Sequence, residues 1–184
     1  MMMADDGYYI YTGRDDEVIP PEVTRVRIHE SVTVIRARAF RGNRNIEEVD
    51  CDNVITVEEC AFYNCPSLRL VIMRGVKVVE RKVFFDCKSL AVVECDKLDR
   101  IGEWAFLHCK SLRSINLPSA KIVENGAFDE CEALTNVEFG KDLESIGPRA
   151  FVNCTSLERI TIPLKDGIIT DNNVFRMCKN LKHV

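Results

Sequence analysis

The chain repeats itself with a period of about two dozen residues, and this repeat constrains the fold more than any other feature. Seven phenylalanines mark the copies, at steps of 22, 22, 22, 22, 23 and 24 residues: Phe40, Phe62, Phe84, Phe106, Phe128, Phe151 and Phe175. A fixed period of this length is typical of a solenoid, in which each copy forms one coil and stacks on the copy before it. The sequence therefore predicts one elongated repeat domain.

Apolar positions recur at fixed offsets from each phenylalanine. A lone coil cannot bury its apolar side, so the copies must stack, and each offset becomes a ladder of like side chains roughly 4.8 Å apart. A polar side chain buried and unpaired in such a ladder would cost on the order of 1–3 kcal/mol. Three residues after the phenylalanines the ladder reads Asn43, Cys65, Cys87, Cys109, Cys131, Cys154 and Cys178.

Each copy also predicts its own strand. Apolar residues nine and eleven positions after the phenylalanine show the period of two that is typical of a strand with one buried face. One strand per coil predicts a parallel sheet. A shorter extended segment is expected to end five residues before each phenylalanine, shifted to Ile169 in the last copy, and Ala-Phe-x-x-Cys is expected to be a short helical turn or loop. The predicted main strands are Glu47–Cys51, Arg69–Met73, Ala91–Cys95, Arg113–Leu117, Thr135–Phe139 and Glu158–Ile162.

The segment 101–118 carries the whole pattern, Ile-Gly-x-x-Ala-Phe-x-x-Cys-x-Ser-Leu-x-x-Ile-x-Leu-Pro. It resembles the leucine-rich repeat of the BspA type. The fold we expect is a β-rich solenoid, a right-handed leucine-rich-repeat superhelix with parallel strands and about seven coils of 22–24 residues, the last incomplete. Proteins of this family are often cell-surface or adhesion proteins of bacteria and parasitic protists, while many others are intracellular.

The two ends of the chain differ from the repeat. The run Tyr8–Tyr11 predicts a strand, and we interpret residues 1–21 as an N-terminal segment that caps the first coil, with a disordered tail as the alternative. The solenoid is expected to span residues 22–184 and to end halfway through a coil. An uncovered sheet edge favours pairing with another chain. We therefore expect a longer array of which this is a fragment, or cover by a partner, or self-association through the C-terminal coil.

Charge and hydropathy narrow the choice of partners. The net charge is −4, from 25 basic and 29 acidic residues, and no run of Lys or Arg occurs. This argues against nucleic acid, whose binding depends on phosphate neutralisation. The first residues do not resemble a signal peptide, and no apolar run is long enough to span a membrane. We expect no membrane insertion and a cytoplasmic location, or surface exposure if the chain is part of a longer protein.

The nine cysteines invite a metal or disulfide interpretation. No C-x-x-C occurs, so zinc-ligand spacing is absent. Neighbouring ladder cysteines could come within disulfide range. Buried thiols are nevertheless good small hydrophobic groups, and we expect free thiols in the core. Cys60 lies outside the ladder and is the cysteine expected to be exposed.

Catalytic candidates are few. The histidines His29, His108 and His183 fall on different coils, and His108 is expected on an exposed turn. No Ser or Cys pairs with it in a known motif. We expect no catalytic, cofactor or metal site and no cofactor. A hydrolase that uses His108 with a nearby acid is the third-ranked hypothesis for function.

The outward positions of the main strands are the most informative for function. On a parallel sheet, eight and ten residues after each phenylalanine, they form two exposed columns that contain an apolar cluster with an acidic rim. Such a cluster is typical of a contact surface, and ordinary β-propensity is the alternative. We predict a non-enzymatic scaffold that binds a protein partner there, with a cell-surface adhesin as the runner-up. The predicted binding residues are Leu70, Ile72, Val92, Glu48, Asp50 and Glu94.

Overall fold

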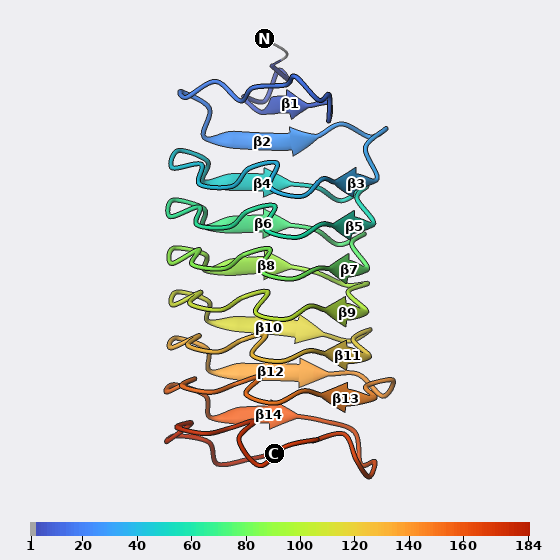
Figure 1. Ribbon diagram of the computed structural model, residues 1–184, viewed down its shortest axis with the longest axis vertical. Helices are drawn as coiled ribbons and strands as arrows, with labels where there is room; N and C mark the ends of the chain where they lie inside the picture. The colour runs from blue at the N-terminus through green and yellow to red at the C-terminus, as the bar shows by residue number, and fades with distance from the viewer. Residues whose placement is uncertain (1–2) are drawn as a thin grey trace.

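The computed structural model describes residues 3–184, and within them every regular element is a β-strand. The strands stack along one axis in a ladder-like column, with β1 at one end and β14 toward the other (Figure 1). The strands are β1 (Tyr9–Tyr11), β2 (Arg25–Ile28), β3 (Val34–Ile35), β4 (Glu48–Asp50), β5 (Thr56–Val57), β6 (Leu70–Ile72), β7 (Val78–Val79), β8 (Val92–Glu94), β9 (Arg100–Ile101), β10 (Ser114–Leu117), β11 (Ile122–Val123), β12 (Asn136–Phe139), β13 (Ser145–Ile146) and β14 (Arg159–Thr161).

One strand per coil forms the main ladder, as the repeat predicted. All its pairs are parallel, and each predicted strand is present, shorter by at most one residue at each end. Val26 pairs with Val49, Val49 with Val71 and Val71 with Val93, so each coil lies on the next without a shift in register. The valine side chains point inward and their neighbours outward, because successive side chains of a strand alternate.

A second ladder runs along the short strands β3, β5, β7, β9, β11 and β13. Its six strands correspond to six full coils, close to the seven predicted with the last incomplete. The inward residue is the predicted Ile or Val five positions before the phenylalanine. In the last copy Ile169 forms a single parallel bridge to Ile146, at the shifted position that the sequence indicated. Its side chain is 39% exposed, and the adjacent Ile168 is buried instead.

The third side of each coil is the turn that carries the phenylalanine, and it holds no helix among the described residues. Residues two before and two after the phenylalanine adopt left-handed backbone angles, for example Lys82 (φ 55°) and Asp86 (φ 60°). This places three peptide N–H groups per coil toward the next coil. Lys82, Phe84 and Asp86 donate to the carbonyl oxygens of Glu103, Ala105 and Leu107 at 2.9, 2.7 and 2.8 Å. The turn side is therefore a third hydrogen-bonded wall, which offsets the cost of the left-handed residues.

The phenylalanines form a continuous stack through the core. Five neighbouring pairs from Phe40 to Phe151 have ring centroids 4.8, 5.4, 5.1, 5.1 and 5.2 Å apart. These separations are typical of stacked aromatic pairs, which add about 0.5–1.5 kcal/mol each beyond area burial. The stack and the aliphatic ladders form a single core along the whole solenoid.

The N-terminal segment continues the core by one layer. The predicted strand is present as β1, which pairs in parallel with β2 and turns Tyr9 and Tyr11 inward. The Tyr11 ring lies 4.8 Å from that of Phe40, in place of a preceding phenylalanine. The carboxylate of Glu17 accepts hydrogen bonds from the Tyr9 hydroxyl at 2.9 Å and the Thr12 backbone at 2.9 and 3.1 Å. The division into a cap of residues 1–21 and a solenoid of 22–184 stays a prediction.

The main ladder has one interruption. β8 and β10 are not paired, so the ladder divides into a five-stranded sheet from β1 to β8 and a three-stranded sheet of β10, β12 and β14. The second ladder is continuous past this point through β7 and β9. At the break the thiol of Cys95 donates to the carbonyl oxygen of Asn116 at 3.5 Å. The strand face thus lacks strand pairing next to Val92, while the second ladder stays paired across the same coils.

The predicted exposure of Cys60 is wrong. Its side chain is only 8% exposed. Cys60 occupies one of the left-handed turn positions, which Arg38 and Lys82 hold in the coils before and after it. The stacked coils therefore bury a turn residue whose burial a single copy of the repeat does not reveal.

Candidate functional site

The outward side of the main strands, here called the strand face, brings the six predicted binding residues together. Glu48, Leu70 and Val92 follow one another across β4, β6 and β8. A second column on the same face holds the other three predicted residues, in the order Asp50, Ile72 and Glu94. Val92 is 48% exposed, whereas Leu70 and Ile72 are half-buried. Leu70, Ile72 and Val92 thus form one contiguous apolar patch.

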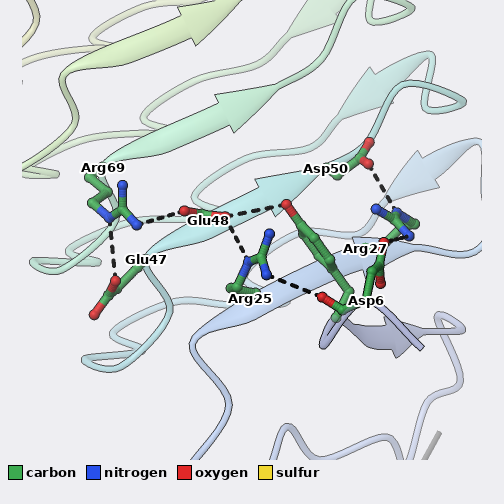
Figure 2. Close-up of polar contacts among 8 residues, drawn as sticks. Asp6, Arg25, Arg27, Glu47, Glu48, Asp50 and Arg69 are labelled. Atoms are coloured by element: carbon green, nitrogen blue, oxygen red, sulfur yellow. Dashed lines mark hydrogen bonds and ion pairs between the residues drawn. The ribbon is translucent and has the colours of Figure 1, made fainter. Parts of the chain in front are cut away.

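The rim of this patch is more strongly paired than the sequence indicated. Glu48 accepts hydrogen bonds from Arg25 Nε at 2.8 Å and from Arg69 Nη2 at 2.6 Å, as Figure 2 shows. The Tyr8 hydroxyl donates to the same carboxylate at 3.3 Å. Burial acts to raise the pKa of Glu48, but the hydrogen bond from Arg25 and the charges of Arg25 and Arg69 outweigh it, so the pKa lies below its usual value. Glu48 is therefore an ionised group with its oxygens occupied.

The second column has a similar arrangement at its N-terminal end. Arg27 donates from Nε to Asp50 at 3.0 Å and from Nη1 to Asp6 at 2.8 Å (Figure 2). The guanidinium carbons of Arg25 and Arg27 lie 4.1 and 4.3 Å from the centroid of the Tyr8 ring. Cation–π contacts of this kind stabilise the arginine side chains in one orientation. The N-terminal segment therefore covers one end of the strand face.

At the other end of the patch, Glu94 pairs with a single arginine. Arg74 contacts Glu94 through Nη2, and its Nη1 lies 2.8 Å from Asp52 Oδ2. All three side chains are exposed to a substantial degree. The rim of the apolar patch thus consists of ion pairs of alternating sign and not of free carboxylates.

The turn side carries a hollow that the sequence analysis did not identify. We call it the turn-side hollow; it lies between successive coils, and its lining includes Trp104, Leu107, His108, Asp129, Glu130 and Arg149. Asp129 is the buried charged residue of the described chain, with 4% of its surface exposed. Gly126, with φ 60°, lies against the Trp104 indole, and a Cβ there would stand 2.5 Å from Cδ1. Glycine at this position therefore lets the indole lie flat along the wall of the hollow.

His108 faces carboxylates rather than a nucleophile. Its Nε2 lies 3.2 Å from Glu130 and its Nδ1 lies 3.5 Å from Asp86. It is half-buried, less exposed than the turn position suggested. Within residues 3–184 no group of three His, Cys, Asp or Glu side chains is placed to hold a metal ion. The same residues contain no helix with the length and apolarity that crossing a membrane requires.

All nine cysteines are free thiols, as the repeat predicted. Eight are buried and Cys178 is half-buried. Burial raises the pKa of Cys109 and Cys131 above the usual value for a thiol, and it raises that of Cys95 to about 12. These groups are therefore protonated at neutral pH and poor nucleophiles.

Two of these features left a trace in the sequence. Arg25 and Arg27 stand on the same columns as Glu48 and Asp50, so ion pairs between neighbouring strands were visible from the register. Asp129 follows Phe128 directly, where the other central coils have Tyr63, Phe85, Leu107 and Val152. A single carboxylate in that column was visible in the aligned copies. The contact of the Tyr8 ring with Arg25 and Arg27 could not be predicted in this way, because Tyr8 lies outside the repeat.

The stacked parallel coils, with one main strand and one phenylalanine each, define the class of leucine-rich-repeat solenoids. Six copies of the BspA type leucine rich repeat region match this sequence, over residues 21–122 and 99–184. The chain belongs to this family.

Two solved structures illustrate the relationship. A leucine-rich repeat protein from Bacteroides ovatus is 30% identical and superposes with a TM-score of 0.77 over 88% of this chain. The match spans 42% of the length of that protein. The leucine rich repeat protein of T. pallidum shares the fold, with 23% identity, a TM-score of 0.76, and coverage of 98% of this chain and 86% of its own. No curated protein matches the sequence.

Proposed function

We propose that the chain is a non-enzymatic protein-interaction scaffold that binds a partner on its strand face, at the apolar patch of Leu70, Ile72 and Val92. The observation that supports it best is the register, which places these three residues side by side on β6 and β8. A contiguous apolar patch with a polar rim is typical of protein contact surfaces, because charged residues are rare at the centre of such surfaces.

The geometry of the rim supports this use of the face. Arg25, Arg69 and Arg74 are each held by carboxylates on neighbouring coils, so their side chains lose little further freedom when a partner binds. A partner would desolvate an apolar centre inside a frame of ion pairs that are already formed. Apolar burial contributes about 25 cal/mol per Å², and the fixed frame gives the contact its orientation.

The break between β8 and β10 adds a second supporting feature. It lies beside Val92, the most exposed residue of the patch. The backbone N–H and C=O groups of β8 and β10 do not form the strand pairing that joins the other neighbouring strands of the main ladder. A partner segment at the patch would find polar backbone atoms beside the apolar side chains, a combination that provides both affinity and orientation.

The test is a capture experiment from native lysate with purified, tagged chain. Leu70→Asp/Ile72→Asp should release a partner that the wild type holds. Ser114→Asp/Asn116→Asp is the matched control, because it adds the same charge to the same face one coil beyond the patch. Circular dichroism and thermal unfolding check that each variant is folded. Capture of the same set by both double variants, or of nothing by the wild type, would mean that the patch is inert.

A cytoplasmic location is part of the proposal. The supporting feature is the cysteine ladder, whose thiols donate hydrogen bonds in the core. A disulfide would remove these donors, and thiols persist in reducing compartments. Alkylation of the protein in intact cells, followed by fractionation, tests this. A secreted or surface-bound form of a longer chain would favour the adhesin hypothesis instead.

His108 has no catalytic role in this proposal. The residue lies beside two carboxylates, Asp86 and Glu130. No hydroxyl or thiol is hydrogen-bonded to it within the described residues, whereas hydrolysis by nucleophilic catalysis needs such a pair. Any hydrolytic activity lost on His108→Ala in a folded variant would contradict the proposal.

A further inference from the structure

The turn-side hollow contains a carboxylate, Asp129, where the neighbouring coils have an apolar side chain. The residue directly after each phenylalanine forms an outer column along the turn wall. Leu107 and Val152 occupy this column in the coils before and after Asp129. The backbone of Asp129 is in the ordinary ladder, since its carbonyl oxygen accepts from the His108 N–H at 3.0 Å. Asp129 therefore differs from the residues at the same position in the neighbouring coils only in its side chain.

This carboxylate is buried and only half satisfied. Asp129 is 4% exposed. Its Oδ2 accepts a hydrogen bond from Arg149 Nη2 at 3.0 Å. Its Oδ1 is buried and has no hydrogen-bond partner, and it is the one such side-chain atom among residues 3–184. A buried carboxylate oxygen with no partner requires an explanation, because nearly all such atoms in folded proteins are bonded.

The surroundings of Asp129 favour a positive charge. Glu130 and Asp86 add two further carboxylates around His108. Among the nearby cations, Lys110 forms an ion pair with Glu132, with Nζ 2.7 Å from Oε1. The same Nζ lies 3.9 Å from Glu130 Oε2. Arg149 already uses Oδ2, and its own side chain is 61% exposed. Lys88 also lies 3.3 Å from Asp86, so three cationic side chains face the four carboxylates of Asp86, Asp129, Glu130 and Glu132.

The walls of the hollow suit a long side chain with a charged end. Leu107 and the Trp104 indole supply apolar surface, and Gly126 keeps the wall beside the indole free of a side chain. The described residues offer no three-ligand metal cluster here. Apolar walls with a carboxylate among the lining residues match the stem and the cationic end of lysine or arginine.

We propose that the turn-side hollow binds the ammonium or guanidinium end of a lysine or arginine side chain from a protein partner, and that the side chains around Asp129 move on binding so that its Oδ1 becomes the acceptor. Glu130 supplies a second carboxylate at the mouth, and Arg149 remains on Oδ2. This site lies on the turn side, so it is separate from the strand face and does not depend on the function proposed there.

The test uses Trp104, the one tryptophan of the chain, as the reporter. Its indole N–H resonance is followed by NMR during titration with Nα-acetyl-lysine methylamide and Nα-acetyl-arginine methylamide. Nα-acetyl-norleucine methylamide is the control compound, because it has an apolar side chain without the charge. We expect a saturable shift with at least one of the two cationic compounds and none with norleucine.

Two variants locate the binding. Asp129→Asn keeps the shape of the side chain and removes the charge, and it should weaken binding by at least about tenfold, as expected for loss of a hydrogen bond to a charged group. Asp142→Asn is the matched control, since Asp142 is exposed and does not line the hollow. Glu130→Gln provides a second variant within the hollow and should weaken binding less.

Three results would overturn the proposal. No saturable shift with either cationic compound would mean that Oδ1 is satisfied by water alone. An equal response to norleucine would mean that the walls bind apolar groups without the charge. Unchanged affinity in folded Asp129→Asn and Glu130→Gln would place the binding elsewhere on the chain.

Discussion

The thiol of Cys109 donates a hydrogen bond of 3.2 Å to the carbonyl oxygen of Phe84, one coil before it. The same bond joins each ladder cysteine to the phenylalanine of the preceding coil, at 2.9–3.2 Å. The first copy has no phenylalanine before it and carries Asn43 instead, whose Oδ1 accepts from the backbone N–H groups of Asn45 and Ile46 at 2.9 Å. The cysteine column is thus a column of donors as well as of small apolar groups.

Replacement of a ladder cysteine should reveal this bond. Cys109→Ala removes the donor and a small volume, whereas Cys51→Ala removes a similar buried volume from a thiol with no hydrogen bond in the described structure. We expect Cys109→Ala to lower the free energy of unfolding by about 0.5–1 kcal/mol more than Cys51→Ala, the usual net value of such a bond. Urea unfolding measures both, and equal losses would mean that the thiol acts by volume alone.

The thiols should differ sharply in reactivity. Cys178 is half-buried, while the other eight are buried. With a thiol-reactive chromogenic reagent at neutral pH, we expect one fast equivalent and the remaining thiols only after denaturation. Cys178→Ser should abolish the fast phase. Rapid labelling of several thiols in that variant would contradict the buried ladder.

The phenylalanine stack should carry much of the stability. Phe106 is fully buried between Phe84 and Phe128. Phe106→Ala should lower the free energy of unfolding by about 3–5 kcal/mol, because it leaves a cavity in the middle of the stack. Phe175→Ala is the control, since Phe175 is half-buried and should lose less. A loss below about 1 kcal/mol for Phe106→Ala would be incompatible with a packed stack.

Asp129 should reduce stability at neutral pH. Burial raises the pKa of its carboxyl above the usual value of 3.8, although the Arg149 guanidinium partly opposes this. A carboxyl with a raised pKa in the folded state favours folding only while it is protonated, so its ionisation destabilises the protein as the pH rises from about 3.8 through the raised value.

The variant Asp129→Val tests this sign, because valine stands at the same position in the next coil. It should be more stable than wild type at pH 7 by about 1–2 kcal/mol, through removal of an incompletely bonded buried group. The difference should shrink in thermal unfolding as the pH falls below 3.8. A variant that is less stable than wild type at pH 7 would mean that the pair with Arg149 outweighs the burial.

The break in the main ladder should be visible in hydrogen exchange. Asn116 in β10 faces the unpaired side toward β8, whereas Glu138 in β12 is paired in register with β10. We expect the Asn116 amide to exchange at least about tenfold faster than that of Glu138, because local opening there breaks no strand pairing. Equal protection of the two amides would show that β8 and β10 pair in solution.

Much of the fold followed from the sequence because the repeat copies one set of contacts. Phe106, Cys109 and Leu112 occupy ladder positions that every coil must bury, so the period alone placed them in the core, and the strand register followed from the same period. It also placed Leu70, Ile72 and Val92 on one face, where alternation along a strand leaves no other choice. Their use as a binding surface stays a prediction.

Only the tertiary structure decided how the exceptions to the repeat are accommodated. Four such exceptions depend on contacts between coils: the ring of Tyr8 over Arg25, the burial of Cys60, the unpaired Oδ1 of Asp129 and the break beside Val92. A periodic pattern specifies what the copies share, since each coil buries the same positions against its neighbour. Contacts between residues that do not repeat depend on distance in space, and stacking the coils is what sets those distances.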